Sequence, residues 1–142
     1  MKRNKKLDDL LGPMEPTASF HDARILSAFI DYVRRTAMVE FEICVGDPEA
    51  SDLSLRERCR RGRLIVSGLM FWSIEHTTAV SSFGDGPPWL TSDGLLDEAP
   101  TNEGKQLAKK VGNIDVIAWY LYFSDLNSFG YCIAQDARFD WL

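Results

Sequence analysis

Two histidines are the side chains best suited to acid–base chemistry at neutral pH in this sequence. Each stands beside an acidic residue, in the pairs His21-Asp22 and Glu75-His76. Histidine changes charge near neutral pH, so the two pairs could form an acid–base or metal site if their strands are adjacent. Because neighbouring residues of a strand point to opposite faces, at most one residue of each pair could face a shared site. Satisfied polar groups at strand ends are the competing interpretation.

The other reactive side chains do not form a recognisable catalytic pattern. The sequence has no nucleophile-elbow serine, no Gly-rich phosphate loop, no CxxC pair and no HExxH motif. Its three cysteines, Cys44, Cys59 and Cys132, are an odd number and no two are close in sequence. This spacing argues against a disulfide framework and favours a reducing cytoplasm. We predict no bound metal or cofactor, and a role in binding rather than catalysis.

Arginines are concentrated in one short stretch of the chain. Residues 56–63 contain five of them, and Glu57 is the only acid in between. The candidate partner-binding arginines are Arg56, Arg58, Arg60 and Arg61, with Arg63 completing the cluster. Guanidinium groups suit carboxylates, so this stretch could contact another protein through an acidic surface. The alternative is that these arginines pair with the chain's own acids, such as Asp47, Glu49 and Asp52.

The loop at residues 82–90, SFGDGPPWL, adds Trp89 to the candidate partner-binding residues. Aromatic side chains between rigid turns can form a binding lip, because function collects on long loops that a sheet supports. The same residues could instead close one end of the core.

The longest apolar run, RLIVSGLMFWSIE from Arg63 to Glu75, predicts the central strand of the fold. Its β-branched and aromatic residues favour a strand over a helix. Since side chains of a strand alternate, both faces of this run are largely apolar, which is typical of a strand covered on two sides. Gly68 interrupts the run and predicts a bulge or a close crossing.

Two segments before this run predict an antiparallel hairpin. The first spans about Ser19 to Val33, where helical spacing is a competing interpretation, and a short polar connector separates it from the second. The second alternates cleanly, which predicts five inward side chains: Ala37, Val39, Phe41, Ile43 and Val45.

The remaining segments are predicted to be less regular until the chain returns to strand. We predict a long exposed connection at residues 46–62, with a short helix that begins at Ser51 or Ser54. A long middle loop is predicted at residues 77–113, with a short helix at 101–111. The strands expected after it are residues 114–123, 128–135 and 137–142. Residues 1–18 are expected to be a polar N-terminal tail with one short helical turn.

Length and charge limit the class of protein. The chain has 142 residues, enough for one domain, which we place at residues 19–142. Its fold is predicted to be α+β and β-rich, with about six mostly antiparallel strands, one or two short helices and a long middle loop. The net charge of −5 argues against nucleic-acid binding. No stretch is predicted to be a secretory signal or a membrane span, so we expect a cytoplasmic protein.

The stretch Ser19-Phe20-His21-Asp22-Ala23, followed by Ile30-Asp31-Tyr32 and residues 64–74, resembles a loosely defined group of small bacterial domains. In that group Phe-His-Asp opens the first strand, and an apolar strand with a central Gly follows the hairpin. Some members are immunity proteins of polymorphic-toxin systems. The resemblance implies a β-rich, non-enzymatic bacterial domain.

These observations lead to one expected function and one alternative. We expect a non-catalytic bacterial protein-binding module, of an immunity type that neutralises a toxin, whose partner is another protein with an acidic surface. A homodimer stays open. The alternative is a small enzyme or ligand-binding domain that uses His21, Asp22 and His76.

Overall fold

The computed structural model of the chain describes residues 1–74 and 87–142. The strands of this part are β1 Ala23–Asp31, β2 Thr36–Cys44, β3 Cys59–Ile74, β4 Trp89–Leu95, β5 Ile117–Phe123 and β6 Ser128–Trp141. The helices are α1 Leu53–Arg56 and α2 Asn102–Val111, with 3₁₀-helices η1 Lys2–Asn4, η2 Leu7–Leu10 and η4 Leu96–Glu98. The predicted β-rich chain of six antiparallel strands with two helices is therefore confirmed for the described residues.

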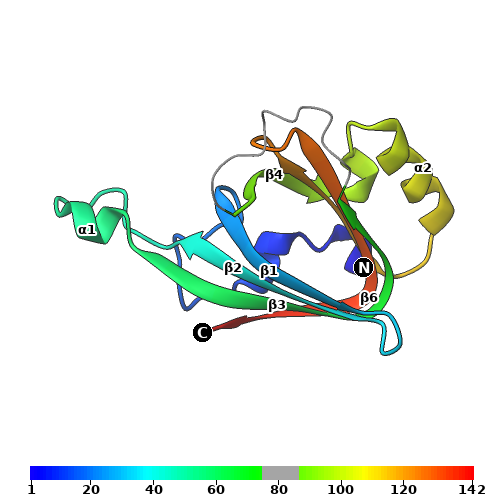
Figure 1. The fold of residues 1–142 in the computed structure, drawn as a ribbon, viewed down its shortest axis with the longest axis horizontal. Coiled ribbons are helices and arrows are strands. Elements are labelled where there is room, and N and C mark those ends of the chain that lie inside the picture. Colours follow the sequence, from blue (N-terminus) through cyan, green and yellow to red (C-terminus); the bar gives the residue numbers. More distant parts are fainter. Residues whose placement is uncertain (75–86) are drawn as a thin grey trace.

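The six strands close into a barrel in the order β1-β2-β3-β6-β5-β4, with every neighbouring pair antiparallel (Figure 1). The sheet is thus two three-stranded meanders, β1-β2-β3 and β4-β5-β6. The long β3 and β6 join them on one side. On the other side β1 and β4 are in register only at Ala23 with Leu90 and Arg24 with Trp89.

The alternation of β2 fills the barrel interior as predicted. The five residues expected to point inward are all buried, and they pack in one core cluster with residues of the other strands. Between them Met38 and Cys44 are exposed on the outer face. Side chains of a strand alternate between two faces, so the period of two in the sequence predicted this strand correctly.

Strand β3 is longer than predicted and leaves part of its outer face uncovered. It begins at Cys59, so residues 59–62 belong to the sheet and not to the expected exposed connection. The predicted bulge is confirmed, because Gly68 has φ +59° and the register with β6 shifts just after it. The expectation of a strand covered on both sides is wrong at Met70 and Phe71, which are 44% and 37% exposed on the outside of the barrel.

The chain after β3 is more regular than predicted. Residues expected in the long middle loop form β4 and η4, and the short helix expected at 101–111 is confirmed as α2. The turn predicted at Gln135-Asp136 is wrong, since β6 runs through it. The side chain of Gln135 instead occupies the space beside Gly68, where a Cβ would lie 2.3 Å from its amide oxygen. The Gln135 side chain therefore lies beside the bulge of β3, in space that any residue larger than glycine would fill. Residues 77–86 of the expected loop lie outside the described residues.

The N-terminal segment packs against the barrel, so the expectation of a polar tail is wrong for its apolar residues. The predicted helical turn is present as η2, and Leu7 and Leu11 are buried in the core cluster of the barrel. The indole N–H of Trp119 donates to the carbonyl of Lys5 at 2.7 Å, and that of Trp141 donates to the carbonyl of Leu11 at 3.1 Å. Figure 1 shows this segment, in dark blue, within the ring of strands.

Helix α2 packs on the outside of the barrel over β5 and β6. Its apolar residues join a second buried cluster, made of Leu96, Ala99, Val111, Val116, Ala118, Tyr131 and Ile133. Thr101 caps the helix by accepting the backbone N–H of Gly104 at 3.0 Å. This cluster fixes the helix beside the outer face of the sheet, next to the uncovered part of β3 (Figure 1).

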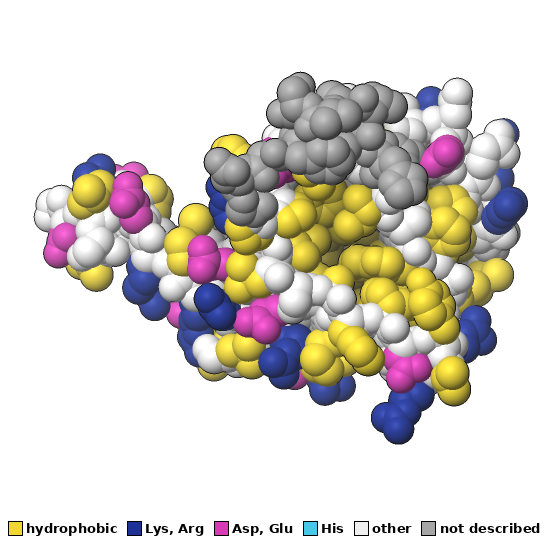
Figure 2. Space-filling model, in the orientation of Figure 1, with side chains coloured by type: hydrophobic (Ala, Val, Ile, Leu, Met, Phe, Trp, Pro, Cys, Tyr) yellow, Lys and Arg dark blue, Asp and Glu magenta, His cyan; other side chains and the backbone are white. Residues whose placement is uncertain are grey.

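The connection between β2 and β3 projects from the body as an arm, residues 45–58, that carries α1 (Figures 1 and 2). The cap of α1 is Asp52, which accepts the N–H of Ser54 at 3.0 Å, and not Ser51 or Ser54 as predicted. No helix of the described residues is long and apolar enough to cross a membrane.

Candidate functional site

The predicted arginine cluster has partners within the protein. Arg58 and Arg60 both donate to the buried carboxylate of Glu15, at 2.9 Å and 3.0 Å. Arg60 also stands over the ring of Trp141, with its guanidinium carbon 5.4 Å from the centroid. Arg61 lies 3.7 Å from Glu40. The arginines thus pair with acids far from them in sequence, and not with the three nearby acids that the sequence offered.

These ion pairs change the electrostatics of Glu15. The hydrogen bond from Arg60 has the largest effect and, with that from Arg58, holds the pKa of the Glu15 carboxyl below its usual range against the opposing effect of burial. Arg56, in α1, is exposed and forms no ion pair with a described residue. Binding of an acidic partner by these arginines stays a prediction. Two of the four, Arg58 at the end of the arm and Arg60 in β3, also tie this part of the chain to the N-terminal segment.

Trp89, the other predicted partner-binding residue, begins β4 and is 37% exposed. The guanidinium carbon of Arg24 lies 5.5 Å from its ring centroid, which is cation–π geometry. Its backbone N–H donates to Asp125 at 3.3 Å. Trp89 therefore lies at the short β1–β4 seam, and β1 and β2 separate it from the arginines of β3. Residues 82–86 of the expected binding lip lie outside the described residues.

The alternative histidine site can be described only in part. His21 and Asp22 are both exposed, with Nε2 and Oδ2 3.6 Å apart, and His76 lies outside the described residues. The structure brings a different carboxyl toward His21. The pKa of Asp93 is raised to about 6, first by burial and then by the carboxylate of Asp8, while His21 and Lys6 oppose the rise. Sequence reasoning missed Asp93, because it stands in a segment that was expected to be irregular.

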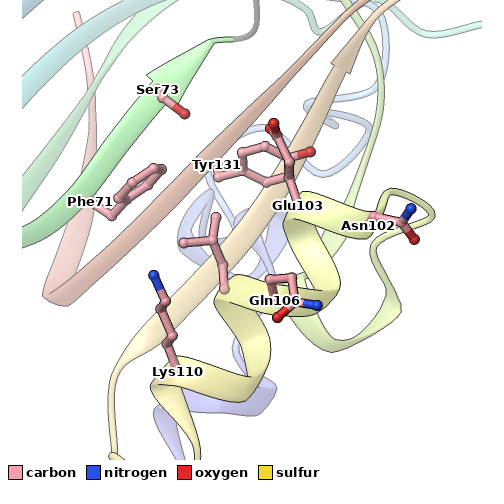
Figure 3. A pocket seen from close by; sticks show the side chains of 8 residues that line it. Phe71, Ser73, Asn102, Glu103, Gln106, Lys110 and Tyr131 are labelled. Atoms are coloured by element: carbon pink, nitrogen blue, oxygen red, sulfur yellow. The ribbon is translucent and has the colours of Figure 1, made fainter.

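The described residues contain no group of three or more His, Cys, Asp or Glu side chains that could hold a metal ion. Beside α2, however, they form a groove of about 390 Å³. Figure 3 shows Phe71 and Ser73 of β3 on one side, α2 on the other, and Tyr131 of β6 between them. The helix contributes Asn102, Glu103, Gln106, Leu107 and Lys110.

The floor of this groove is fixed by burial and a hydrogen bond. Tyr131 is 1% exposed, and its hydroxyl lies 2.5 Å from that of Thr101, the cap of α2. Leu107 packs against the same buried cluster. Because helix and sheet are held at the floor, their rims stand apart and leave the Phe71 ring partly open to solvent.

A second, smaller hollow of about 170 Å³ continues the groove toward the end of α2. It shares Phe71, Leu107 and Lys110 with the first and adds Met70 and Ile114, which is 52% exposed. We define the apolar groove as the surface made by Met70, Phe71, Leu107, Ile114 and Tyr131.

Charge is sparse on the apolar groove. Among the described residues, Glu103 in the first turn of α2 and Lys110 in its last turn are the only charged residues that line it. Neither forms an ion pair with a described residue. At 1.5 Å per residue, the seven-residue separation places their Cα atoms about 10 Å apart along the helix. The groove thus has an apolar floor and two opposite charges on one rim.

The comparisons with known proteins do not identify this chain. Protein-family models, curated proteins and solved structures give no significant match. The sequence did contain one signal for the apolar groove, since both faces of the run from Arg63 to Glu75 are apolar. In a closed barrel only one face of a strand can point inward, so the other face must be covered or remain exposed.

Proposed function

We propose that this protein is a non-catalytic module that binds another protein through the apolar groove. The observation that carries the proposal is the exposure of Met70, Phe71 and Ile114 around one continuous hollow. Single exposed apolar residues are ordinary, but a contiguous apolar surface with a polar rim is typical of a protein interaction site. Among the described residues that line the groove, no nucleophile stands beside a base, which favours binding over catalysis.

The charges on the rim favour one kind of occupant. A segment lying along α2 would place its large apolar side chains over Phe71 and Leu107, with a carboxylate near Lys110 and a cation near Glu103. An extended chain covers about 10 Å in three residues. We therefore propose a partner segment with apolar residues flanked by a basic and an acidic side chain. Opposite charges at the rim set register and specificity more than they set affinity.

An immunity-type role, with a toxin as the partner, is the form of this proposal that the sequence resemblance favours. It requires a bacterial cytoplasmic protein, which stays a prediction. An immunity protein acts by occupying a surface of its toxin, so it needs a docking surface and no catalytic group. Within this proposal the exposed Arg56 would be a separate contact, because α1 and α2 lie at opposite ends of the longest axis of the molecule (Figure 1).

Selection from a displayed library of random peptides would test the apolar groove. We expect the enriched peptides to carry apolar residues between a basic and an acidic one, and to lose at least tenfold in affinity for Phe71→Ala. The matched control is Phe29→Ala, because Phe29 is 67% exposed on the outer face of β1. Lys110→Glu should turn the preference toward basic peptides. Selected peptides that bind both phenylalanine variants as tightly as the unmodified protein would refute the assignment of the groove.

A further inference from the structure

Two cysteines that are far apart in sequence face each other at the base of the arm. Cys44 ends β2 and Cys59 begins β3, and they are direct partners in the register of the two strands. Their Sγ atoms lie 3.6 Å apart, and both residues are exposed. The spacing of the cysteines in the sequence does not show this pair, because the hairpin brings together residues that the arm separates.

The hydrogen bonds beside the pair define its backbone geometry. The N–H of Val45 donates to the carbonyl of Arg58 at 2.9 Å, so these two residues form a hydrogen-bonded pair of the antiparallel ladder. Such pairs alternate with non-hydrogen-bonded ones, which makes Cys44 and Cys59 a non-hydrogen-bonded pair. Cα atoms in such a pair are about 4.5 Å apart, inside the range of about 4.4–6.8 Å that a disulfide spans.

We propose that Cys44 and Cys59 are a thiol–disulfide exchange site whose oxidant is a low-molecular-weight disulfide of the glutathione type. The thiolate of one cysteine attacks a sulfur of the small disulfide, which forms a mixed disulfide and releases one small thiolate. The second cysteine then attacks the protein sulfur of the mixed disulfide. This forms the Cys44–Cys59 bond and releases the second small thiolate. The two protons lost by the protein thiols go to the two small thiolates.

The surroundings of the pair set how fast it reacts. Burial, followed by the hydrogen bond with Cys44, raises the pKa of the Cys59 thiol to about 11, and the carboxylates of Glu42 and Glu57 add to the rise. Since the thiolate is the attacking species, the exchange is slow at neutral pH and accelerates as the pH rises. Exposure of both residues lets the small disulfide approach. Cys132 is 1% exposed in the core and cannot compete.

Oxidation would link the two ends of the arm covalently and leave the strand pairing of the barrel unchanged. The new bond closes a ring from residue 44 to residue 59 that contains α1 and the exposed Arg56. A disulfide exposed at the surface is among those that small thiols reduce most readily, so the site would be reversible. The inference stands on the cysteine geometry alone and does not depend on the apolar groove.

Incubation of the full chain with glutathione disulfide at pH 8 tests the site. After alkylation of the remaining thiols in denaturant, mass spectrometry should find two of the three cysteines protected from alkylation and two hydrogen atoms lost. Cleavage by trypsin at Arg56 or Arg58 should give two fragments that separate only after reduction. Cys132→Ala should behave identically, whereas Cys44→Ser should stop at a mixed disulfide with one glutathionyl group. A fully alkylated protein, a bond to Cys132, or unresolved mixed disulfides in the unmodified protein would each overturn the proposal.

Discussion

Asp93 offers a test of the electrostatics where β4 meets the charges of the N-terminal segment. Burial and the nearby carboxylate of Asp8 raise its pKa from 3.8 to about 6. Its ionised form is therefore disfavoured in the folded protein compared with the unfolded chain. Below pH 3.8 the carboxyl is protonated in both states and costs nothing. Stability is lost as the pH rises through 6, and the loss stays constant above it.

The size of this loss follows from the pKa difference. A rise of about two pH units in pKa corresponds to about 3 kcal/mol if it is transferred fully to stability. Asp93 is only partly buried, and solvent screening reduces the expected value to about 1–2 kcal/mol. Asp93→Asn keeps the shape of the side chain and removes the charge. It should therefore raise the free energy of unfolding by about 1–2 kcal/mol at pH 7.5 and leave it nearly unchanged at pH 3.5.

Urea unfolding of both proteins between pH 3.5 and pH 8 measures this difference. Glu98→Gln is the matched control, since Glu98 is an exposed acid in η4 without a hydrogen bond or ion pair to a described residue. Its free energy of unfolding should follow that of the unmodified protein at every pH. Two results would refute the burial argument. One is a gain in the free energy of unfolding of Asp93→Asn that is the same at every pH, and the other is a variant less stable than the unmodified protein above pH 6.

Two further substitutions probe the contacts of the N-terminal segment. Trp119→Phe removes the indole N–H that binds the Lys5 carbonyl and leaves a gap in the core, so urea melts should show a loss of about 2–4 kcal/mol, and a loss below about 0.5 kcal/mol would mean that the segment is not packed as described. Glu15→Gln removes a carboxylate whose pKa is lowered by Arg60 and Arg58. The ion pairs of this carboxylate stabilise the folded protein above pH 4.5, and this stabilisation is lost as the pH falls through the folded-state pKa. The urea midpoint of the unmodified protein should therefore fall more steeply than that of the variant below pH 4.5, and parallel curves would contradict the ion pairs.

The sequence predicted the strands whose periodicity is undisturbed and failed where the backbone departs from it. β2 alternates from end to end, and its four inward residues, together with Val45 just after it, were predicted correctly. In β1 the register shifts between Ile25 and Ser27. A strict alternation would put Ile25 and Phe29 on one face, yet Ile25 is buried and Phe29 is exposed, because one extra residue in a strand reverses every side chain after it.

The candidate site was harder to predict because it depends on contacts between distant segments. A lysine-rich N-terminus resembles a solvated tail. Its sequence does not show that two of its carbonyls accept hydrogen bonds from the indole N–H groups of Trp119 and Trp141, which are more than 100 residues away. The arginines are ordinary members of a charged stretch until Glu15 is placed between two of them. The apolar groove likewise requires α2 to lie beside β3, and no local sequence pattern predicts that these two elements are neighbours.

The unequal junctions of the barrel give the two meanders a particular relation. Each meander is continuous in sequence, residues 23–74 and 89–141, so its strand pairs form between near neighbours along the chain. The junction at β3 and β6 extends along both strands, whereas the seam at β1 and β4 holds two residue pairs. Partial unfolding should therefore separate β1 from β4 first. The β3–β6 junction, which carries Phe71 and Tyr131 on adjacent strands, should stay paired and keep the floor of the groove assembled.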